Sequence, residues 1–217
     1  MAREIRITPS ILNADRGNLA YEISRIAVES DYIHLDVMDD IFVPNFTFDF
    51  DTAKEIIKNS PVSIDSHLMV ANVDEIAISY AQAGSASVTF HVEAAGDIRR
   101  TARGIRAAGS RASIAIKPKS AITDYENFFS DVDMVLIMTV EPGFGGQAFM
   151  EEMLPKIKTA RKIIGDRPIW LQVDGGISLE TIERAADAGA DTFVAGSAVF
   201  KANDPAAMIR ELRASIA

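Results

Sequence analysis

The chain has 217 residues, 48% of them hydrophobic, and a formal charge of −9 from 31 acidic and 22 basic residues. This length predicts one domain with a substantial core, and the acidic balance argues against a nucleic-acid surface, which needs a basic stripe. Cysteine is absent from the sequence, which excludes disulfides and thiolate metal sites.

The sequence shows neither a signal-peptide pattern nor a membrane-spanning segment. Residues 1–6 carry charges where a signal peptide would need an apolar run. No segment approaches the ~20 apolar residues of a membrane-spanning helix. The densest basic group recurs at helical spacing, and we interpret it as a solvated helix face. It consists of Arg99, Arg100, Arg103 and Arg106. We therefore expect a cytoplasmic globular protein with neither a membrane nor a nucleic-acid partner.

Short apolar runs alternate with longer amphipathic segments along the chain. Strands are predicted near residues 5–11, 32–37, 62–68, 86–91, 112–116, 133–139, 169–173 and 192–195. Helices are predicted near residues 16–29, 50–59, 73–83, 97–108, 121–129, 150–164, 179–188 and 204–215. Eight such pairs imply parallel strands joined by crossover helices. They predict a single-domain (β/α)8 barrel over residues 1–217. A doubly wound open sheet is the alternative, but eight regular units favour closure.

Titratable side chains end several of the predicted strands. Asp36 and Asp174 each end an apolar run, and His67 ends another. His34 is two residues before Asp36, so both side chains point to the same side of their strand. A barrel gathers its reactive groups at this end. Each residue alone is best interpreted as a hydrogen-bonded strand end, but four at equivalent ends favour a site. His91 ends the fourth strand, and a structural or supporting role behind the site is favoured for it.

These four side chains predict a metal centre and proton transfer. Two nitrogen and two oxygen ligands suit one divalent ion, either zinc, iron(II), manganese or cobalt. The carboxylates of Asp36 and Asp174 can present a base and an acid to opposite faces of a small substrate.

Glycines cluster after the last three predicted strands. Their backbone N–H groups can turn inward around phosphate oxygens, and barrels often bind phosphate in these loops. Tight turns also need glycine, and no P-loop spacing is present. The cluster residues are Gly143, Phe144, Gly145, Gly146, Gly175, Gly176, Gly196 and Ser197. Together they predict an anion site at the same end of the barrel as the titratable cluster.

Three methionines, Met38, Met69 and Met138, lie near the ends of the second, third and sixth predicted strands. They have an ordinary interpretation as core filling. They also suit an apolar cap that keeps water from an anionic intermediate. The sequence favours neither interpretation over the other.

Together, these residues resemble the ribulose-phosphate 3-epimerase family through nearly the whole chain. The matching segments are residues 9–12, 34–39, 42–45, 67–70, 89–93, 138–147, 173–176 and 194–197. The resemblance implies a (β/α)8 barrel that interconverts D-ribulose 5-phosphate and D-xylulose 5-phosphate through a 2,3-enediolate. It also implies a place in carbohydrate metabolism, in the pentose phosphate pathway or in a specialised catabolic route.

The resemblance implies roles for individual residues. His34, Asp36, His67 and Asp174 match the ligands of one divalent metal ion per subunit, and His67 and Asp174 also match substrate contacts. Asp36 matches the proton acceptor and Asp174 the proton donor. Ser10 matches a substrate contact near the metal, and the glycine loops match contacts to the sugar and its phosphate. The implied partner is a small phosphorylated ketose, and family members commonly form homo-oligomers, as dimers or hexamers.

The chain departs from the family pattern at Asp40, Ile41, Asp49 and Lys119. These positions lie in predicted loops near the mouth, so a related 3-epimerase acting on another ketose phosphate, such as D-allulose 6-phosphate, remains an alternative. A non-catalytic metal- or phosphate-binding barrel is a second alternative. A decarboxylase or synthase on the same scaffold is a third, disfavoured because its lysine-centred network is not visible and Lys117 is the only nearby lysine.

Overall fold

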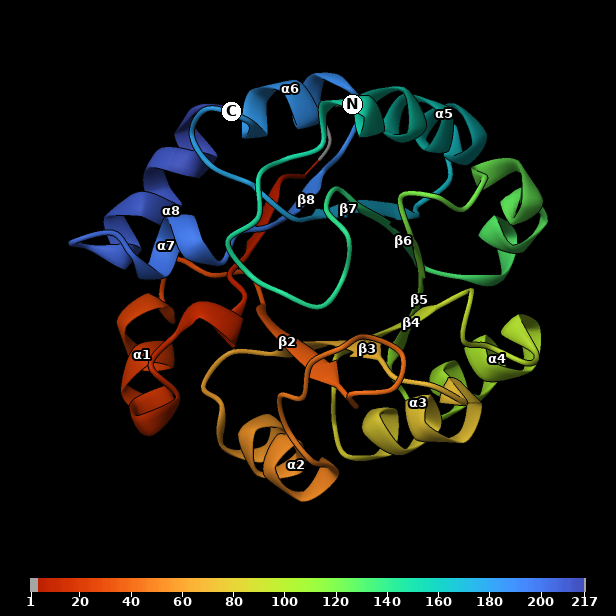
Figure 1. Ribbon diagram of the computed structural model, residues 1–217, viewed down its shortest axis with the longest axis horizontal. Coiled ribbons are helices and arrows are strands. Elements are labelled where there is room, and N and C mark those ends of the chain that lie inside the picture. Colours follow the sequence, from red (N-terminus) through yellow and green to blue (C-terminus); the bar gives the residue numbers. More distant parts are fainter. Residues whose placement is uncertain (1–3, 217) are drawn as a thin grey trace.

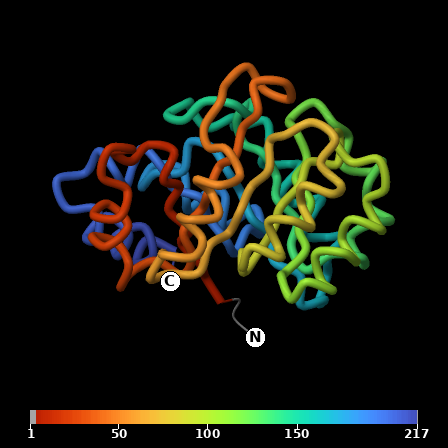
Figure 2. Tube along the Cα trace, turned by 90° about the horizontal axis from the view of Figure 1, so that it is seen from below, coloured from red at the N-terminus to blue at the C-terminus, as the bar shows by residue number. Residues whose placement is uncertain are grey.

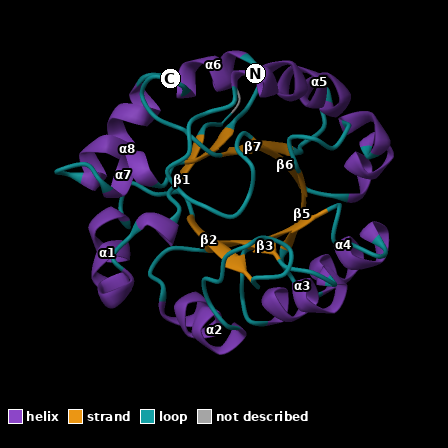
Figure 3. Ribbon diagram, in the orientation of Figure 1, coloured by secondary structure: helices purple, strands orange, loops and turns teal. Residues whose placement is uncertain are grey.

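The computed structural model describes residues 4–216, in which eight parallel strands form the wall of a barrel and helices surround them (Figures 1 and 3). The strands are β1 (Arg6–Thr8), β2 (Ile33–Met38), β3 (Ile64–Met69), β4 (Ser87–His91), β5 (Arg111–Ile116), β6 (Met134–Met138), β7 (Trp170–Asp174) and β8 (Thr192–Val194). Each of the eight predicted strands is present.

The sheet runs β1-β8-β7-β6-β5-β4-β3-β2, with every paired neighbour parallel. Its two ends meet where Ser10 and His34 form a parallel bridge, and the His34 N–H donates to the Pro9 carbonyl at 2.9 Å. This contact brings β1 and β2 together. The predicted (β/α)8 barrel is therefore confirmed, and the alternative of a doubly wound open sheet is wrong.

The outer ring of helices follows the prediction at most positions. It contains α1 (Leu19–Ile26), α2 (Phe50–Asn59), α3 (Val73–Gln82), α4 (Ile98–Ala107), α5 (Leu154–Ile164), α6 (Ile182–Asp187), α7 (Ser197–Phe200) and α8 (Pro205–Ala214). Aspartates begin three of them: the side chains of Asp49, Asp97 and Asp204 accept backbone N–H groups of the first turn. Such caps satisfy donors that have no partner inside the helix.

Two elements differ from the prediction. The α-helix expected near residues 121–129 is instead two 3-10 turns, Ile122–Asp124 and Glu126–Asp131, which bury Phe129 fully. Its polar residues, such as Asp124 and Asn127, compete with helical backbone bonds and favour turns. The short helix α7 was not predicted, because four residues are too few to show a period.

Alternation along the strands separates two environments. Outward side chains, such as Leu35, Phe90 and Phe193, are fully buried beneath the helices. Inward side chains are largely polar. The loop after β2 and the loop after β6 project from one end of the barrel, and the described chain enters β1 from the other (Figure 2). Among residues 4–216, no helix combines the length and apolar character needed to span a bilayer.

Candidate active site

Four titratable side chains meet at the C-terminal end of the barrel. His34 and Asp36 project from β2, His67 from β3, and Asp174 ends β7. One donor atom from each residue lies within 4.8 Å of the other three. Because β3 and β7 are four strands apart in the ring of eight, the cluster spans the interior. The structure thus brings together all four residues that the strand-end pattern singles out.

The spacing of the donor atoms suits a single metal ion. His67 Nδ1 lies 3.1 Å from Asp36 Oδ1, 3.3 Å from His34 Nε2 and 3.4 Å from Asp174 Oδ2. His34 Nε2 lies 3.4 Å from Asp36 Oδ1 and 3.9 Å from Asp174 Oδ2. Ligands about 2.1 Å from a tetrahedral ion are about 3.4 Å apart. The four residues therefore fit such an ion.

The imidazole of His34 faces the cluster with its Nε2 atom. Its Nδ1 lies 2.9 Å from Asp65 Oδ2, and that oxygen also accepts from Gln172 Nε2 at 2.8 Å. A carboxylate only accepts hydrogen bonds, so His34 has a hydrogen on Nδ1, and Nε2 is the ring nitrogen placed to bind a metal. An outer partner of this kind is usual for metal-binding histidines.

A second chain of contacts lies behind His67. Its Nε2 is 3.0 Å from His91 Nε2, and His91 Nδ1 is 3.2 Å from Glu93 Oε2. Burial lowers the pKa of His91 to about 4, although the hydrogen bond with Glu93 acts in the opposite direction. His91 is therefore neutral near neutral pH, and it lies behind the cluster rather than in it.

Electrostatics draw positive charge to the cluster. Burial opposes ionisation of Asp36, but the imidazoles of His34 and His67 outweigh it and hold its pKa far below the usual range. Burial also lowers the pKa of His34, while Asp36 and Asp65 outweigh it and raise that pKa well above its usual value. Buried carboxylates are costly unless a cation neutralises them, and a divalent ion meets this need.

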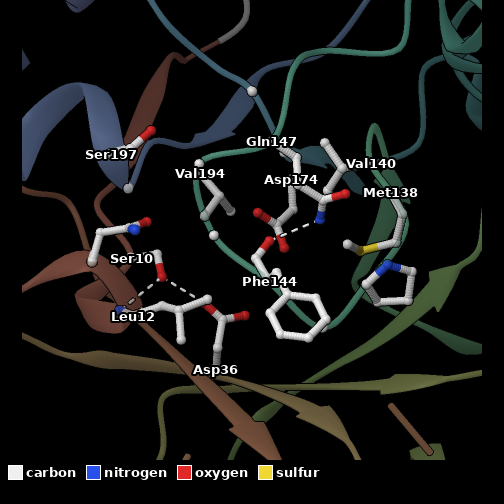
Figure 4. A pocket seen from close by; sticks show the side chains of 18 of the residues that line it. Ser10, Leu12, Asp36, Met138, Val140, Phe144, Gln147, Asp174, Val194 and Ser197 are labelled. Carbon is white, nitrogen blue, oxygen red and sulfur yellow. Dashed lines mark hydrogen bonds between the residues drawn. The ribbon is translucent and has the colours of Figure 1, made fainter. Parts of the chain in front are cut away.

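A cavity of about 50 Å³ opens above the cluster (Figure 4). The carboxylates of Asp36 and Asp174 approach it from opposite sides, and Ser10 Oγ donates to Asp36 Oδ2. Its predicted lining residues are Ser10, Asp36, Met38, Met69, Met138, Gly143, Phe144, Gly145, Gly146, Asp174, Gly175, Gly176, Gly196 and Ser197. His34 and His67 are fully buried beneath it.

The three methionines pack in the core and also border the cavity. Met38 and Met69 pack with Val43, and Met138 packs with Leu136, in two small buried clusters. All three also border the cavity. They are core residues whose surface forms part of the cavity wall.

Two glycines in the loop after β7 admit no other residue. A Cβ on Gly175 would lie 2.5 Å from Val140 Cγ2, and one on Gly176 would lie 2.3 Å from the Phe149 backbone nitrogen. Both also have positive φ, 122° and 68°, which L side chains rarely adopt. The close approach keeps this loop thin where it borders the cavity.

Three residues near the glycine loops were not singled out by the sequence. Asn13 Oδ1 lies 2.6 Å from the Cβ positions of both Gly145 and Gly196, so its amide lies between two loops. Gln147 Nε2 donates to the carbonyls of Glu141 and Phe144 and closes the loop on itself. Lys201 Nζ lies 4.0 Å from the Cβ position of Gly146. No local pattern indicated Asn13 and Lys201, because each contacts a loop that is distant in the sequence, whereas Gln147 contacts its own loop.

The departures from the family pattern lie outside the cavity lining. Asp49 caps α2 by accepting the Thr52 N–H. Asp40 has φ 59°, and Ile41 is exposed beside it. Lys119 Nζ lies 3.7 Å from Glu141 Oε1 at an exposed position. These residues belong to the surrounding loops and do not line the cavity.

Comparison with known proteins identifies the relatives of this chain. Residues 6–200 match the model of the ribulose-phosphate 3 epimerase family. The ribulose-phosphate 3-epimerase of Mycobacterium leprae (strain TN) is 46% identical over 209 residues, covering 95% of this chain and 93% of the relative. The ribulose-phosphate 3-epimerase of Rhodobacter capsulatus is 44% identical over 200 residues, covering 92% and 87%.

A solved structure shares the architecture. The crystal structure of a 3-hexulose-6-phosphate synthase superposes with a TM-score of 0.74, covering 98% of this chain and 100% of that chain, at 21% identity. At this level of identity the similarity concerns the fold alone.

Proposed function

The chain belongs to the ribulose-phosphate 3-epimerase family, and from this premise we propose that it interconverts D-ribulose 5-phosphate and D-xylulose 5-phosphate. Family membership makes it an epimerase. The observation that carries the proposed mechanism is the placement of two carboxylates, Asp36 and Asp174, on opposite sides of one small cavity (Figure 4). Inversion at a carbon requires a base on one face and an acid on the other.

The proton chemistry follows from this placement. The C3 hydrogen lies next to the C2 carbonyl, so its removal leaves the electron pair in a 2,3-enediolate. Asp36 accepts the proton on one face, and the carboxylic acid of Asp174 returns a proton on the other. Configuration inverts and no atom is lost. In the reverse direction the two residues exchange roles.

His34, Asp36, His67 and Asp174 would hold one divalent ion, zinc, iron(II), manganese or cobalt, in each subunit. When bound, the ion supplies positive charge for the oxygens on which negative charge develops. The Ser10 hydroxyl orients Asp36 by donating to Oδ2, the oxygen that does not face the histidines. His67 supports the same carboxylate from the other side.

Phosphate would be bound on the glycine side of the cavity. Backbone N–H groups of the glycine loops suit its oxygens, and the Lys201 ammonium lies near Gly146. The loops include Gly143, Gly145, Gly146, Gly175, Gly176, Gly196 and Ser197. Binding energy gained there is remote from C3 and holds the reacting carbon between the two carboxylates.

Apolar side chains would exclude water from the intermediate. Met38, Met69 and Met138 border the cavity, and Phe144 contributes to its lining from the loop after β6. Phe144 remains 55% exposed. An anionic enediolate in such an enclosure is protected from stray protons.

The alternative substrate is a larger ketose phosphate such as D-allulose 6-phosphate. The pentose phosphate is favoured because the departures at Asp40, Ile41, Asp49 and Lys119 are absent from the cavity lining. Family membership also favours a homo-oligomer in the cytoplasm. Sedimentation velocity would measure the number of subunits.

One experiment tests the function. The protein, loaded in turn with each candidate metal, is given D-ribulose 5-phosphate or other ketose phosphates in D₂O. We expect conversion of the pentose phosphate to be fastest and to carry deuterium into C3. Metal uptake without deuterium at C3 would indicate a protein that binds metal but is not an epimerase. Faster conversion of the hexose phosphate would show that the hexose phosphate, not the pentose phosphate, is the preferred substrate.

A further inference from the structure

A chain of hydrogen bonds runs from the cluster to the loop after β5. His67 Nε2 contacts His91 Nε2 at 3.0 Å, and His91 Nδ1 contacts Glu93 Oε2 at 3.2 Å. Both imidazoles are fully buried. Neither His91 nor Glu93 lines the cavity, so the mechanism proposed above gives them no task.

Glu93 is placed to accept hydrogen bonds only. Its Oε1 accepts from the Lys117 backbone N–H at 2.9 Å and from the Ser120 hydroxyl, and its Oε2 faces His91. Burial would raise the pKa of this carboxyl, but the hydrogen bonds from His91, Ser120 and Lys117 lower it to about 2. Glu93 therefore remains a carboxylate with three donors around it.

The loop that holds Glu93 is itself fixed. Lys156 Nζ, from α5, donates to the carbonyls of Lys117, Pro118 and Ser120 at 2.9, 2.7 and 2.8 Å. This ammonium is partly buried and meets three acceptors, which matches its three donors. The carboxylate of Glu93 is thus anchored independently of the histidines.

The position of each proton follows from this anchor. Because Glu93 accepts, His91 carries its hydrogen on Nδ1. Only one hydrogen fits between His91 Nε2 and His67 Nε2, which are 3.0 Å apart, and because His91 already donates through Nδ1, that hydrogen belongs to His67 Nε2. Nδ1 is then the ring nitrogen of His67 that faces the cluster, 3.1 Å from Asp36 Oδ1, and a bound metal ion would take the place of any hydrogen on it.

We propose that Glu93, acting through His91, is a positioning residue that fixes the tautomer of His67 and keeps its Nδ1 free for a metal ion. The inference rests on the metal site of the proposed function. Asp65 does the same for His34 through one direct contact of 2.9 Å. The two imidazoles would therefore hold the ring orientation that an ion needs before it arrives, which lowers the cost of binding it.

The tautomers are directly measurable because the chain has only three histidines, His34, His67 and His91. Long-range ¹H–¹⁵N correlation spectra of the unaltered protein report the protonation of each ring nitrogen, with and without zinc. We expect His91 to carry hydrogen on Nδ1 alone in both states. In the zinc-loaded protein we expect His67 to carry hydrogen on Nε2. A His91 ring with hydrogen on Nε2 would overturn the inference, whether or not the protein binds zinc.

The variant Glu93→Gln tests the consequence. Lys117 N–H and Ser120 O–H need an acceptor, so the amide oxygen should face them and its NH₂ should face His91. His91 would then move its hydrogen to Nε2, opposite His67 Nε2–H. We expect zinc affinity, measured by competition with a chromophoric chelator, to fall about 10- to 100-fold. Unchanged affinity with unchanged tautomers would contradict the proposal.

Ser120→Ala is the matched control, since it removes one bond to Glu93 but keeps the carboxylate. We expect zinc affinity within about twofold of the unaltered protein and the same tautomers. Circular dichroism checks that both variants fold. Zinc bound through His67 Nδ1 with His91 protonated on Nε2 would end this inference alone, whereas failure of the unaltered protein to bind any candidate metal would end the proposed metal site.

Discussion

The two faces of the barrel strands differ sharply. The outward face is apolar and fully buried, as at Leu35, Leu68 and Phe193. The inward face is also buried but polar, and among the described residues several of its atoms have no hydrogen-bond partner. These are Asp65 Oδ1, Ser87 Oγ, Thr89 Oγ1, Ser113 Oγ and Gln172 Oε1. Leaving a buried polar group unpaired costs about 1–3 kcal/mol. The outward face stabilises the fold, whereas the unpaired polar groups of the inward face lower its stability and surround the charged cluster.

This division runs between adjacent residues. His34 and Asp36 face the cluster, while Leu35 between them packs in the outer core. A strand places alternate side chains on opposite faces, so one short segment serves both purposes. Substitutions on the inward face should therefore lower activity more than stability, and substitutions on the outward face should lower stability more than activity.

The largest effect is expected on the inward face. Asp36→Asn and Asp174→Asn should each lower kcat by about 10³-fold or more, because each removes a proton-transfer group and weakens metal binding. Metal-free stability, measured by thermal unfolding, should fall more for Asp36→Asn than for Asp174→Asn, because His34 and His67 stabilise the charge of Asp36. Asp49→Asn is the control, because asparagine caps a helix as well as aspartate does. Near-normal turnover of either variant would refute the two-carboxylate mechanism.

The opposite signature is expected at Phe193, which is fully buried on the outward face. Phe193→Ala should lower the free energy of unfolding by about 3–5 kcal/mol, as measured by urea denaturation. The value of kcat per folded molecule should stay within about twofold. Phe193→Leu should show a smaller loss of stability with the same activity. A large fall in kcat with little loss of stability would contradict the claim that outward-facing residues stabilise the fold without acting in catalysis.

Lowering the pH should show how much the hydrogen bonds to the Glu93 carboxylate stabilise the fold. Because its pKa is lowered from 4.5 to about 2 on folding, it contributes stability above pH 4.5 that is lost as the pH falls toward 2. The metal-free protein should therefore lose stability across this window more steeply than Glu93→Gln does. Denaturant unfolding at several pH values measures this. Equal slopes would show that the carboxylate is not stabilised by its donors.

The smallest effect is expected at Lys201, beside Gly146. Lys201→Gln should raise KM for the phosphorylated substrate about threefold to tenfold while kcat changes little, since the ammonium aids ground-state and transition-state binding equally. Lys162→Gln, which alters an exposed lysine of α5, is the control. Equal KM values for the two variants would remove Lys201 from the phosphate site.

The sequence predicted the barrel and its cluster for a common reason. Strand ends are visible in the hydrophobic pattern, and parallel strands bring their ends together. Neither Asp65 nor Glu93 was predicted as a site residue, because Asp65 lies within β3 and Glu93 lies beyond β4. Their roles depend on which side chain they meet across the barrel, which local periodicity does not encode. The prediction of a helix near residues 121–129 was wrong because polar residues favour turns there.

The central claim is that Asp36 and Asp174 act on opposite faces of C3. Each single asparagine variant, kept at saturating metal in D₂O, should exchange the C3 hydrogen of one ketose phosphate with retention of configuration. We predict that Asp174→Asn exchanges one epimer and Asp36→Asn the other, with neither variant interconverting them at an appreciable rate. Exchange of the same epimer by both variants would contradict the account.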